Sequence, residues 1–235
     1  MKKFLTLLLA GLLCTPAFAA MDTPTVAKKA LVYSVSIHTS KEYKRSITLH
    51  HKKKHWWSKK KKDQEMIVPL KDEFVCGGTY IDHDLILTAG HCFQNSPDHV
   101  LVRTLNEQEE VKATLVKLDT GHDLALLYVR GHHAYAKIGP QPQTGEDVIN
   151  IGMPYDLPFM VSHGIVSHVG LYGFEPFTSH YTGTDASCNP GNSGGGMFNS
   201  NAELVGVNTM SQGFFGFGGI TYAVSQSDIL LFLHH

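Results

Sequence analysis

Three short segments carry residue types that together can perform nucleophilic catalysis. His91 lies near the end of CGGTYIDHDLILTAGHC, Asp123 lies in GHDLALLYV, and Ser193 lies in NPGNSGGG. A serine hydroxyl is a poor nucleophile until an imidazole accepts its proton. That imidazole needs a buried carboxylate on its other nitrogen, which fixes the tautomer and stabilises the imidazolium. We therefore interpret His91 as general acid and base, Asp123 as the residue that orients it, and Ser193 as the nucleophile.

Glycines surround Ser193 and would let backbone N–H groups turn toward one point. The tetrahedral intermediate of acyl transfer carries a negative oxygen, which needs preorganised N–H donors. Removing one such donor typically costs about 3–4 kcal/mol of transition-state stabilisation. We expect the amides of Gly191 and Ser193 to form this oxyanion hole, with Asn192 shaping the turn between them.

Each of these residues also has a plainer interpretation. His91 could be a core histidine, and Ser193 could belong to an ordinary glycine-rich turn. Asp123 could be an exposed acid at the start of a strand, with its neighbour Asp119 as a rival. Because the three motifs occur together, we favour the catalytic interpretation of all three.

The pattern of short apolar runs predicts an all-β fold. Runs rich in β-branched and aromatic residues recur between Gly, Asn and Asp, as is typical of a sandwich or barrel. Residues 130–146 are rich in Gly and Pro and indicate a linker between two β halves, residues 20–129 and residues 147–235. The tail SQSDILLFLHH predicts a short C-terminal helix with Ser225 or Ser227 as its N-cap. The runs are LVYSVSI (31–37), LILTA (85–89), ATLVKL (113–118), LALLYV (124–129), DVINIG (147–152), ELVGVN (203–208) and GITYAV (219–224).

The first residues have the form of a secretory signal peptide. A charged start, Lys2 and Lys3, precedes an apolar run too short to cross a bilayer, and the small-x-small sequence AFA precedes the expected cut. No later apolar run is long enough to span a membrane. We therefore expect residues 1–19 to be removed and the mature protein to be soluble and either secreted or periplasmic.

An oxidising compartment lets disulfides persist. Removal of the signal peptide removes Cys14 and leaves Cys76, Cys92 and Cys188. An odd number of cysteines allows at most one internal bridge and leaves one free thiol.

A strongly basic segment interrupts the N-terminal half. Residues 41–62 contain ten of the twenty Lys and Arg residues, in a chain whose formal net charge is −1. We interpret residues 41–65 as an insertion that is either solvated and flexible or a contact for an anionic membrane or polysaccharide. In the second case Trp56 and Trp57 would be amphipathic anchors. Because basicity is confined to this segment, we expect no specific binding of nucleic acid.

Histidine is abundant, with fifteen residues. No carboxylate or cysteine stands at ligand spacing near the clustered histidines, so zinc is the minor alternative and we expect neither a metal nor a cofactor. The clustered histidines are His50, His51, His55, His132 and His133.

The motifs TAGHC, DLALL and GNSGG resemble those of the chymotrypsin-fold (trypsin-like) serine peptidases, in the order His, Asp, Ser. The resemblance covers about residues 30–232. Within that superfamily, IGMPYDLPFMVSHGIVS and ELVGVNT look like the protease domain of the HtrA/DegP group, and the C-terminus resembles bacterial V8-like peptidases. The resemblance implies two packed six-stranded antiparallel β-barrels with the active site between them. It also implies endopeptidase activity on proteins or peptides through an acyl-enzyme intermediate, and leaves the oligomeric state open.

Departures from the family patterns limit what the resemblance implies. Asn192 stands where the trypsin branch has an Asp that pairs with a new N-terminus, so we expect activity without such processing. The HtrA group carries a PDZ domain after the protease; because little more than residues 226–235 follows the last expected strand here, we do not expect that group's peptide sensing and cage assembly. The chymotrypsin-like motifs imply a Cys76–Cys92 bridge, which the HtrA group usually lacks; two buried thiols are the alternative. Cys188 is then interpreted as a small buried residue rather than a reactive thiol.

The resemblance also assigns a specificity pocket. It places Ser187 at the floor of the pocket for the residue that precedes the cut, and Asn208 in the same pocket. Trypsin-like specificity needs Asp at the first position, and V8-like specificity usually needs His at the second. We therefore expect an uncharged, small or medium apolar side chain before the cut.

A second function class stays open beside the peptidase. The chain could be a catalytically idle β-barrel protein that binds anionic surfaces through residues 41–62. Pseudo-enzymes of this fold usually lose a member of the triad, and here all three candidates are present. The peptidase interpretation is therefore favoured.

Overall fold

The computed structural model describes residues 20–49, 64–105, 109–153, 159–172, 178–212 and 219–235. The expected signal peptide and the sequence HHKKKHWWSKKKK therefore lie outside the described residues. Within the described ranges, no helix is long and apolar enough to cross a membrane.

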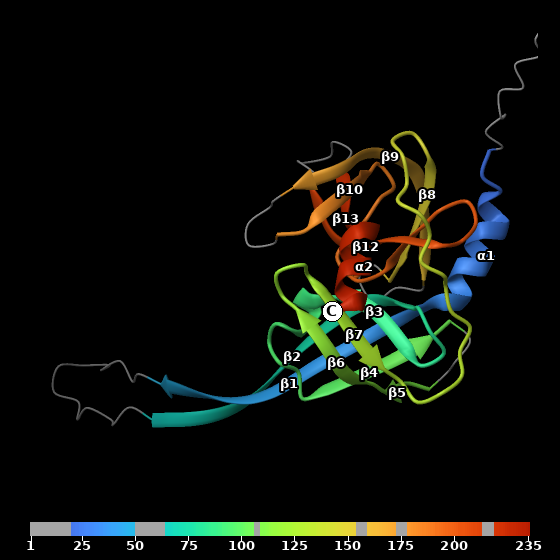
Figure 1. The fold of residues 1–235 in the computed structure, drawn as a ribbon. Coiled ribbons are helices and arrows are strands. Elements are labelled where there is room, and N and C mark those ends of the chain that lie inside the picture. The colour runs from blue at the N-terminus through green and yellow to red at the C-terminus, as the bar shows by residue number, and fades with distance from the viewer. Residues whose placement is uncertain (1–19, 50–63, 106–108, 154–158, 173–177, 213–218) are drawn as a thin grey trace, which may run out of the picture.

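Strands dominate the structure and form two sheets, one in each half of the chain (Figure 1). The predicted all-β class is therefore confirmed. The N-terminal sheet has seven strands in the order β5-β4-β1-β2-β3-β7-β6, with β5 and β6 at its edges, where a six-stranded barrel was expected. Its strands are β1 (Ser34–Leu49), β2 (Gln64–Tyr80), β3 (Leu85–Ala89), β4 (His99–Thr104), β5 (Val111–Lys112), β6 (Thr114–Asp119) and β7 (Leu124–Tyr128).

The C-terminal half closes into a six-stranded barrel in the order β10-β13-β12-β11-β8-β9, as predicted. Its strands are β8 (Asp147–Gly152), β9 (Met160–Tyr172), β10 (His180–Thr184), β11 (Gly196–Phe198), β12 (Leu204–Gln212) and β13 (Ile220–Ser225). Strands alternate their side chains between the two faces of a barrel. One buried apolar residue from each of five strands forms a separate cluster, Val148, Val166, Met197, Val205 and Ala223.

The described part of the basic segment belongs to a long antiparallel pair of strands. β1 and β2 pair antiparallel without a break from Ser34↔Thr79 to Leu49↔Gln64. In Figure 1 the two strands run together away from the rest of the molecule. The arms of the expected insertion, 41–49 and 64–65, are thus continuous with the sheet rather than a separate irregular loop.

The helix α1 (Thr23–Tyr33) was not predicted, because its last residues were assigned to a strand over 31–37. Asp22 caps the helix by accepting a hydrogen bond from the Thr25 amide at 3.5 Å. Val26 and Ala30, four residues apart on one helix face, are buried in the main core. α1 packs beside β8 (Figure 1), so burial of this face decides in favour of the helix.

The predicted C-terminal helix is present as α2 (Gln226–His234), with Ser225 at the N-cap position. Its buried residues include Ile229 and Phe232. Lys117 of β6 lies over the Phe232 ring and donates a hydrogen bond to the Phe232 carbonyl. α2 contacts β12 and β13 as well, so it joins the C-terminal barrel to the N-terminal sheet.

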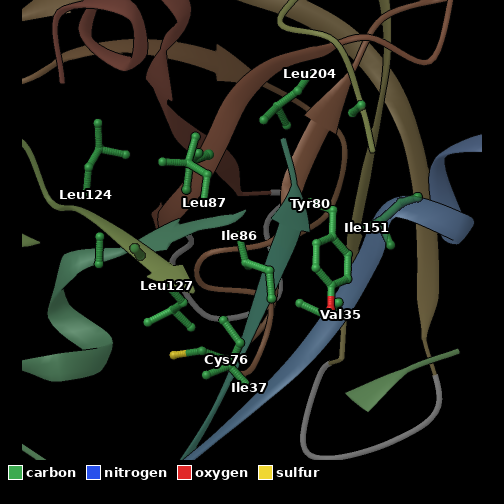
Figure 2. Close-up of a cluster of buried hydrophobic side chains, with 14 of the residues drawn as sticks. Val35, Ile37, Cys76, Tyr80, Ile86, Leu87, Leu124, Leu127, Ile151 and Leu204 are labelled. Atoms are coloured by element: carbon green, nitrogen blue, oxygen red, sulfur yellow. The ribbon is translucent and has the colours of Figure 1, made fainter. Parts of the chain in front are cut away.

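One hydrophobic core spans both halves. Figure 2 shows Val35, Tyr80 and Leu124 of the N-terminal sheet in the same cluster as Ile151 and Leu204 of the C-terminal barrel. All five are essentially inaccessible to solvent. Packing of this shared core fixes the position of each half relative to the other, as a site between them requires.

A disulfide joins Cys76 of β2 to Cys92, with the two Cα atoms 6.5 Å apart and a sequence separation of 16. It is the pairing that the resemblance implied, and Cys188 is the free cysteine.

We expect the double substitution Cys76→Ser and Cys92→Ser to lower the free energy of unfolding by about 3 kcal/mol. The reason is that a closed loop of this length restricts the unfolded chain. Urea denaturation of both proteins measures the difference. Cys188→Ala is the matched control, since it removes a sulfur without opening a loop. An unchanged midpoint in the double variant would contradict the prediction.

Candidate active site

A fully buried carboxylate organises the candidate site. Asp123 is inaccessible to solvent. It accepts a hydrogen bond from the His91 backbone amide at 2.7 Å, and its two oxygens lie 2.9 and 3.1 Å from His91 Nδ1. The Thr209 hydroxyl donates to the same carboxylate from the C-terminal barrel. These donors compensate a charge that would otherwise be costly to bury.

Strand pairing brings His91 and Asp123 together. β3 and β7 pair with Ala89 opposite Leu124, so the residues just after β3 lie beside the residue just before β7. The Gly90 amide donates to the Asp123 carbonyl at 2.9 Å. Asp123 has a φ of 55°, a left-handed conformation that Asp tolerates better than most residues. A sharp bend at this point lets its side chain meet the imidazole.

Ser193 reaches the site from the C-terminal half. His91 and Ser193 line one cleft of about 390 Å³. The Ser193 hydroxyl lies 3.5 Å from the Thr209 carbonyl, a long and weak hydrogen bond. The Ser193 carbonyl accepts from the Gly77 amide of β2 at 2.7 Å. The backbone of the serine is thus fixed to the N-terminal sheet, while its hydroxyl is only weakly held.

The turn before Ser193 has the features of a type II β-turn. The Asn192 amide donates to the Asn189 carbonyl at 2.9 Å. Pro190 is the second residue, and Gly191 is the third with a φ of 100°. Type II turns require a positive φ at the third residue, and this orients the amide between the second and third residues oppositely to a type I turn. Glycine at 191 therefore fixes the direction of its own N–H.

Glycine is also required after the serine. Gly194 has a φ of 82°, and a Cβ there would lie 2.2 Å from Thr88 Oγ1 and 2.4 Å from the Gly77 carbonyl. Its amide donates to the Asn208 carbonyl at 2.7 Å. The segment thus fits between the two halves only without a side chain.

The rival carboxylate, Asp119, has a different place. It accepts from the amides of Gly121 and His122 at 2.9 and 3.0 Å, and from His122 Nδ1 at 2.8 Å. Burial alone would raise the pKa of Asp119, but the hydrogen bonds from His122 and Gly121 and the attraction of His122 hold it below its ordinary value. Asp119 organises the turn that leads to Asp123 rather than contacting His91.

A second pocket, of about 310 Å³, includes Asn189, the first residue of the Asn189–Asn192 turn, in its lining. Ser187 lines it, as the resemblance implied, whereas Asn208 is fully buried and is not among its lining residues. Among the described residues of the lining, the side chains are polar or a thiol. The lining residues are Ser187, Cys188, Asn189, Ser211, Gly219 and Thr221.

Cys188 is partly buried at the edge of this pocket. Burial raises the pKa of its thiol to about 11, against the smaller lowering effect of a hydrogen bond with Asn192. Since the thiolate is the reactive form, the Cys188 thiol is a poor nucleophile near neutral pH.

In the described ranges, the ligand atoms of one group of three converge as a metal would require, those of Cys76, His91 and Cys92. The disulfide occupies both sulfurs. Of the clustered histidines, His132 stacks on His83 and His133 stacks on Tyr80.

Thr209 was not predicted as a site residue, although it supplies a donor to Asp123 and a carbonyl to Ser193. It lies 86 residues from Asp123 in the chain. Its apolar neighbours on β12 predict a strand but carry no signal for a contact with a distant carboxylate.

Comparison with known proteins shows which family the chain resembles. The model of the trypsin-like peptidase domain family matches residues 76–207. Over 138 residues the chain is 38% identical to a probable periplasmic serine endoprotease, DegP-like, of Pseudomonas putida, covering 56% of this chain and 28% of the relative. Over 133 residues it is 39% identical to the serine endoprotease DegS of Haemophilus influenzae, covering 54% and 38%. The chain therefore spans well under half the length of these curated relatives.

Solved structures share the fold. The HtrA-type protease AlgW with a tripeptide is similar with a TM-score of 0.70 and 22% identity, covering 90% of this chain and 62% of that one. A serine endoprotease from Yersinia pestis is similar with a TM-score of 0.64 and 24% identity, covering 92% and 66%.

Replacing Thr209 with Val should lower the free energy of unfolding by about 2 kcal/mol. The substitution keeps the shape but removes a donor from a buried carboxylate. Thr209→Ser keeps the hydroxyl and is the matched control. Urea unfolding compares the three proteins, and equal losses in both variants would show that packing rather than the hydrogen bond matters.

Asp119→Asn should destabilise the protein in a pH-dependent way. The pKa of Asp119 is lower in the folded state than in the unfolded state, so its contribution is present above the unfolded pKa of about 3.9 and is lost as pH falls through the folded pKa. Melting temperatures at pH 7, 5 and 3 should therefore show a deficit that shrinks below about pH 4. A deficit of the same size at every pH would contradict this.

Proposed function

Since the chain belongs to the trypsin-like peptidase domain family, we propose that it is an exported serine endopeptidase. In this proposal Ser193 attacks the peptide carbonyl, His91 is the general acid and base, and Asp123 orients His91. The carrying observation is the hydrogen bond between His91 and the buried Asp123 carboxylate, together with the one cleft that His91 and Ser193 line. The likeness to serine endoproteases of Pseudomonas putida and Haemophilus influenzae supports it.

The proposed reaction begins with a proton transfer. The Asp123 carboxylate can only accept, so His91 Nδ1 carries a proton and Nε2 has the free lone pair. As the Ser193 oxygen bonds to the peptide carbon, its proton moves to His91 Nε2. The same proton then passes to the departing amine when the C–N bond breaks. Water repeats the two steps on the resulting ester and releases the acid.

Charge that develops during these steps needs fixed partners. The imidazolium of His91 would be stabilised by Asp123, whose carboxylate is also held by Thr209. The oxyanion would accept from the amides of Gly191 and Ser193. In the described part of the chain neither amide has an intramolecular acceptor. The positive φ of Gly191 supports this role, because it sets the direction of one donor.

The proposed location is periplasmic or secreted. Residues 1–19 have the form of a signal peptide, and the relative from Pseudomonas putida is described as periplasmic. We propose proteins or peptides as substrates, with an uncharged, small or medium residue before the cut. Among the described residues, no charged side chain lines the pocket at Ser187.

An accessory contact with an anionic surface stays a prediction. The segment with the most lysines, 50–62, lies outside the described residues and follows the last residue of β1 in the chain. A protein with no activity that uses only this contact is the alternative function.

The test is the replacement of Ser193 with Ala. Hydrolysis of casein should fall by about 10⁴-fold or more, because the nucleophile is lost. Labelling by a serine-directed phosphonate should disappear as well. Ser200→Ala, an exposed serine in a neighbouring turn, is the matched control and should keep both signals. Undiminished hydrolysis in Ser193→Ala would overturn the mechanism, and an inactive native protein would favour the alternative.

A further inference from the structure

The turn that precedes Asp123 is held from the C-terminal barrel, and this contact carries an inference that rests on the proposed function. We infer that Ser179 is a positioning residue for the Asp123 carboxylate. Its hydroxyl fixes the peptide group before Asp123 and thereby the direction in which the carboxylate points. Ser179 acts through the backbone of Asp123 and is not itself a catalytic residue.

The backbone of Asp123 has a conformation that is unfavourable on its own. Its φ of 55° lies in the left-handed region, which residues other than glycine populate rarely. Such a conformation persists only where the surrounding structure imposes it. Relaxation to a more common φ would turn the side chain away from His91. Contacts on both sides of Asp123 are therefore needed to keep the carboxylate in place.

Two hydrogen bonds hold the peptide groups on either side of the Asp123 Cα atom. Because a peptide group is planar, the orientations of these two groups set φ and ψ of Asp123. The following group is held by the Gly90 amide, which donates to the Asp123 carbonyl at 2.9 Å. The preceding group contains the His122 carbonyl, which accepts from Ser179 Oγ at 2.8 Å. Gly90 and Ser179 thus fix one orientation each.

Ser179 is itself firmly placed. It is inaccessible to solvent, so no water competes for its hydroxyl. Before it, the Thr178 amide donates to the Gly121 carbonyl at 2.8 Å, and Thr178 Oγ1 donates to the same carbonyl at 3.2 Å. After it, the His180 amide donates to the Asp228 carboxylate of α2. Hydrogen bonds therefore anchor the chain on both sides of Ser179.

The side chain of Tyr181 supports the Ser179 hydroxyl. Tyr181 is inaccessible to solvent, and burial is the main cause that raises the pKa of its phenol to about 12. A hydrogen bond with Ser179 lowers this pKa, whereas the negative charges of Asp123 and Asp228 raise it. The phenol thus lies close to both Ser179 and the Asp123 charge. Ser179 is held by a partner side chain as well as by its backbone.

The other supports of Asp123 do different work. Asp119 accepts from the amides of Gly121 and His122, so it stabilises the shape of the turn. These bonds lie within residues 119–122 and do not connect the turn to the C-terminal barrel. Thr209 binds the Asp123 carboxylate itself. Thr209 and Ser179 therefore tie the side chain of Asp123 and the backbone before it to the same barrel.

Loss of the Ser179 hydroxyl has a distinct kinetic signature. A misdirected Asp123 carboxylate stabilises the His91 imidazolium less well in the transition state, while the surfaces that bind the substrate stay in place. Because a displacement of about 1 Å can cost about 100-fold in rate, we expect Ser179→Ala to lower kcat by at least about 10-fold and to change KM by less than about 2-fold.

A matched variant separates positioning from folding. Ser34 Oγ is buried and donates to the Ala30 carbonyl at 3.0 Å, at the end of α1. Ser34→Ala removes the same kind of hydrogen bond and should leave kcat unchanged. Hydrolysis of fluorescently labelled casein gives kcat and KM, and end-point labelling by a serine-directed phosphonate counts the molecules with a competent Ser193. Equal kcat per labelled molecule in Ser179→Ala and Ser34→Ala would overturn the inference.

A double-mutant cycle tests whether Ser179 acts through Asp123. Asp123→Asn removes the charge that Ser179 positions, so adding Ser179→Ala to it should lower kcat by less than about 2-fold further. A residue that acts on the site independently of Asp123 would lower kcat by the same factor in both backgrounds. Losses that multiply in this way would contradict the inference.

Tyr181→Phe provides the test if Ser179→Ala does not fold. It keeps the aromatic ring and removes the phenol that hydrogen-bonds with Ser179. It should lower kcat at constant KM, and an unchanged kcat would contradict the inference. Hydrolysis that survives Ser193→Ala would refute the proposed function. Hydrolysis that requires Ser193 but not the Ser179 hydroxyl would refute this inference alone.

Discussion

The burial of the Asp123 charge is the constraint on which the rest of the site depends. A carboxylate with no access to water must be surrounded by donors, and removing one partner of such a group is strongly destabilising. Here the donors come from His91 in the N-terminal half and from Thr209 in the C-terminal half. The carboxylate therefore orients the imidazole and also requires the two halves to pack in one relation.

Backbone contacts across the same boundary place the nucleophile. The Gly77 amide of β2 binds the Ser193 carbonyl, and Gly194 fits against Thr88 because it has no side chain. The shared core in Figure 2 holds the boundary closed over a wider area. Positioning is thus distributed over both sheets, while the reactive hydroxyl of Ser193 keeps the freedom to turn toward His91.

Local patterns in the sequence predicted some of these features and not others. The apolar runs predicted six of the strands and part of β1. The motifs named His91, Asp123 and Ser193 as candidates for one site; His91 contacts Asp123 and lines a cleft with Ser193. The helix α1 was missed because the burial of Val26 and Ala30 depends on a barrel formed by residues far along the chain. Thr209 was missed for the same reason, and so was the polar lining of the pocket, which three separate segments contribute. Contacts of this kind follow from topology rather than from spacing.

The C-terminal barrel contains one apolar region and one polar region. One region holds the apolar cluster that includes Val148 and Ala223. The other holds Asn150 and Thr221, which donate to the Ala186 carbonyl, and Asn208, whose amide atoms have no partner among the described residues. Apolar residues at those positions would give a more stable barrel, since an unpaired buried polar group is unfavourable. Because Asn150 and Thr221 both donate to the Ala186 carbonyl, the polar region fixes the backbone that leads into Ser187.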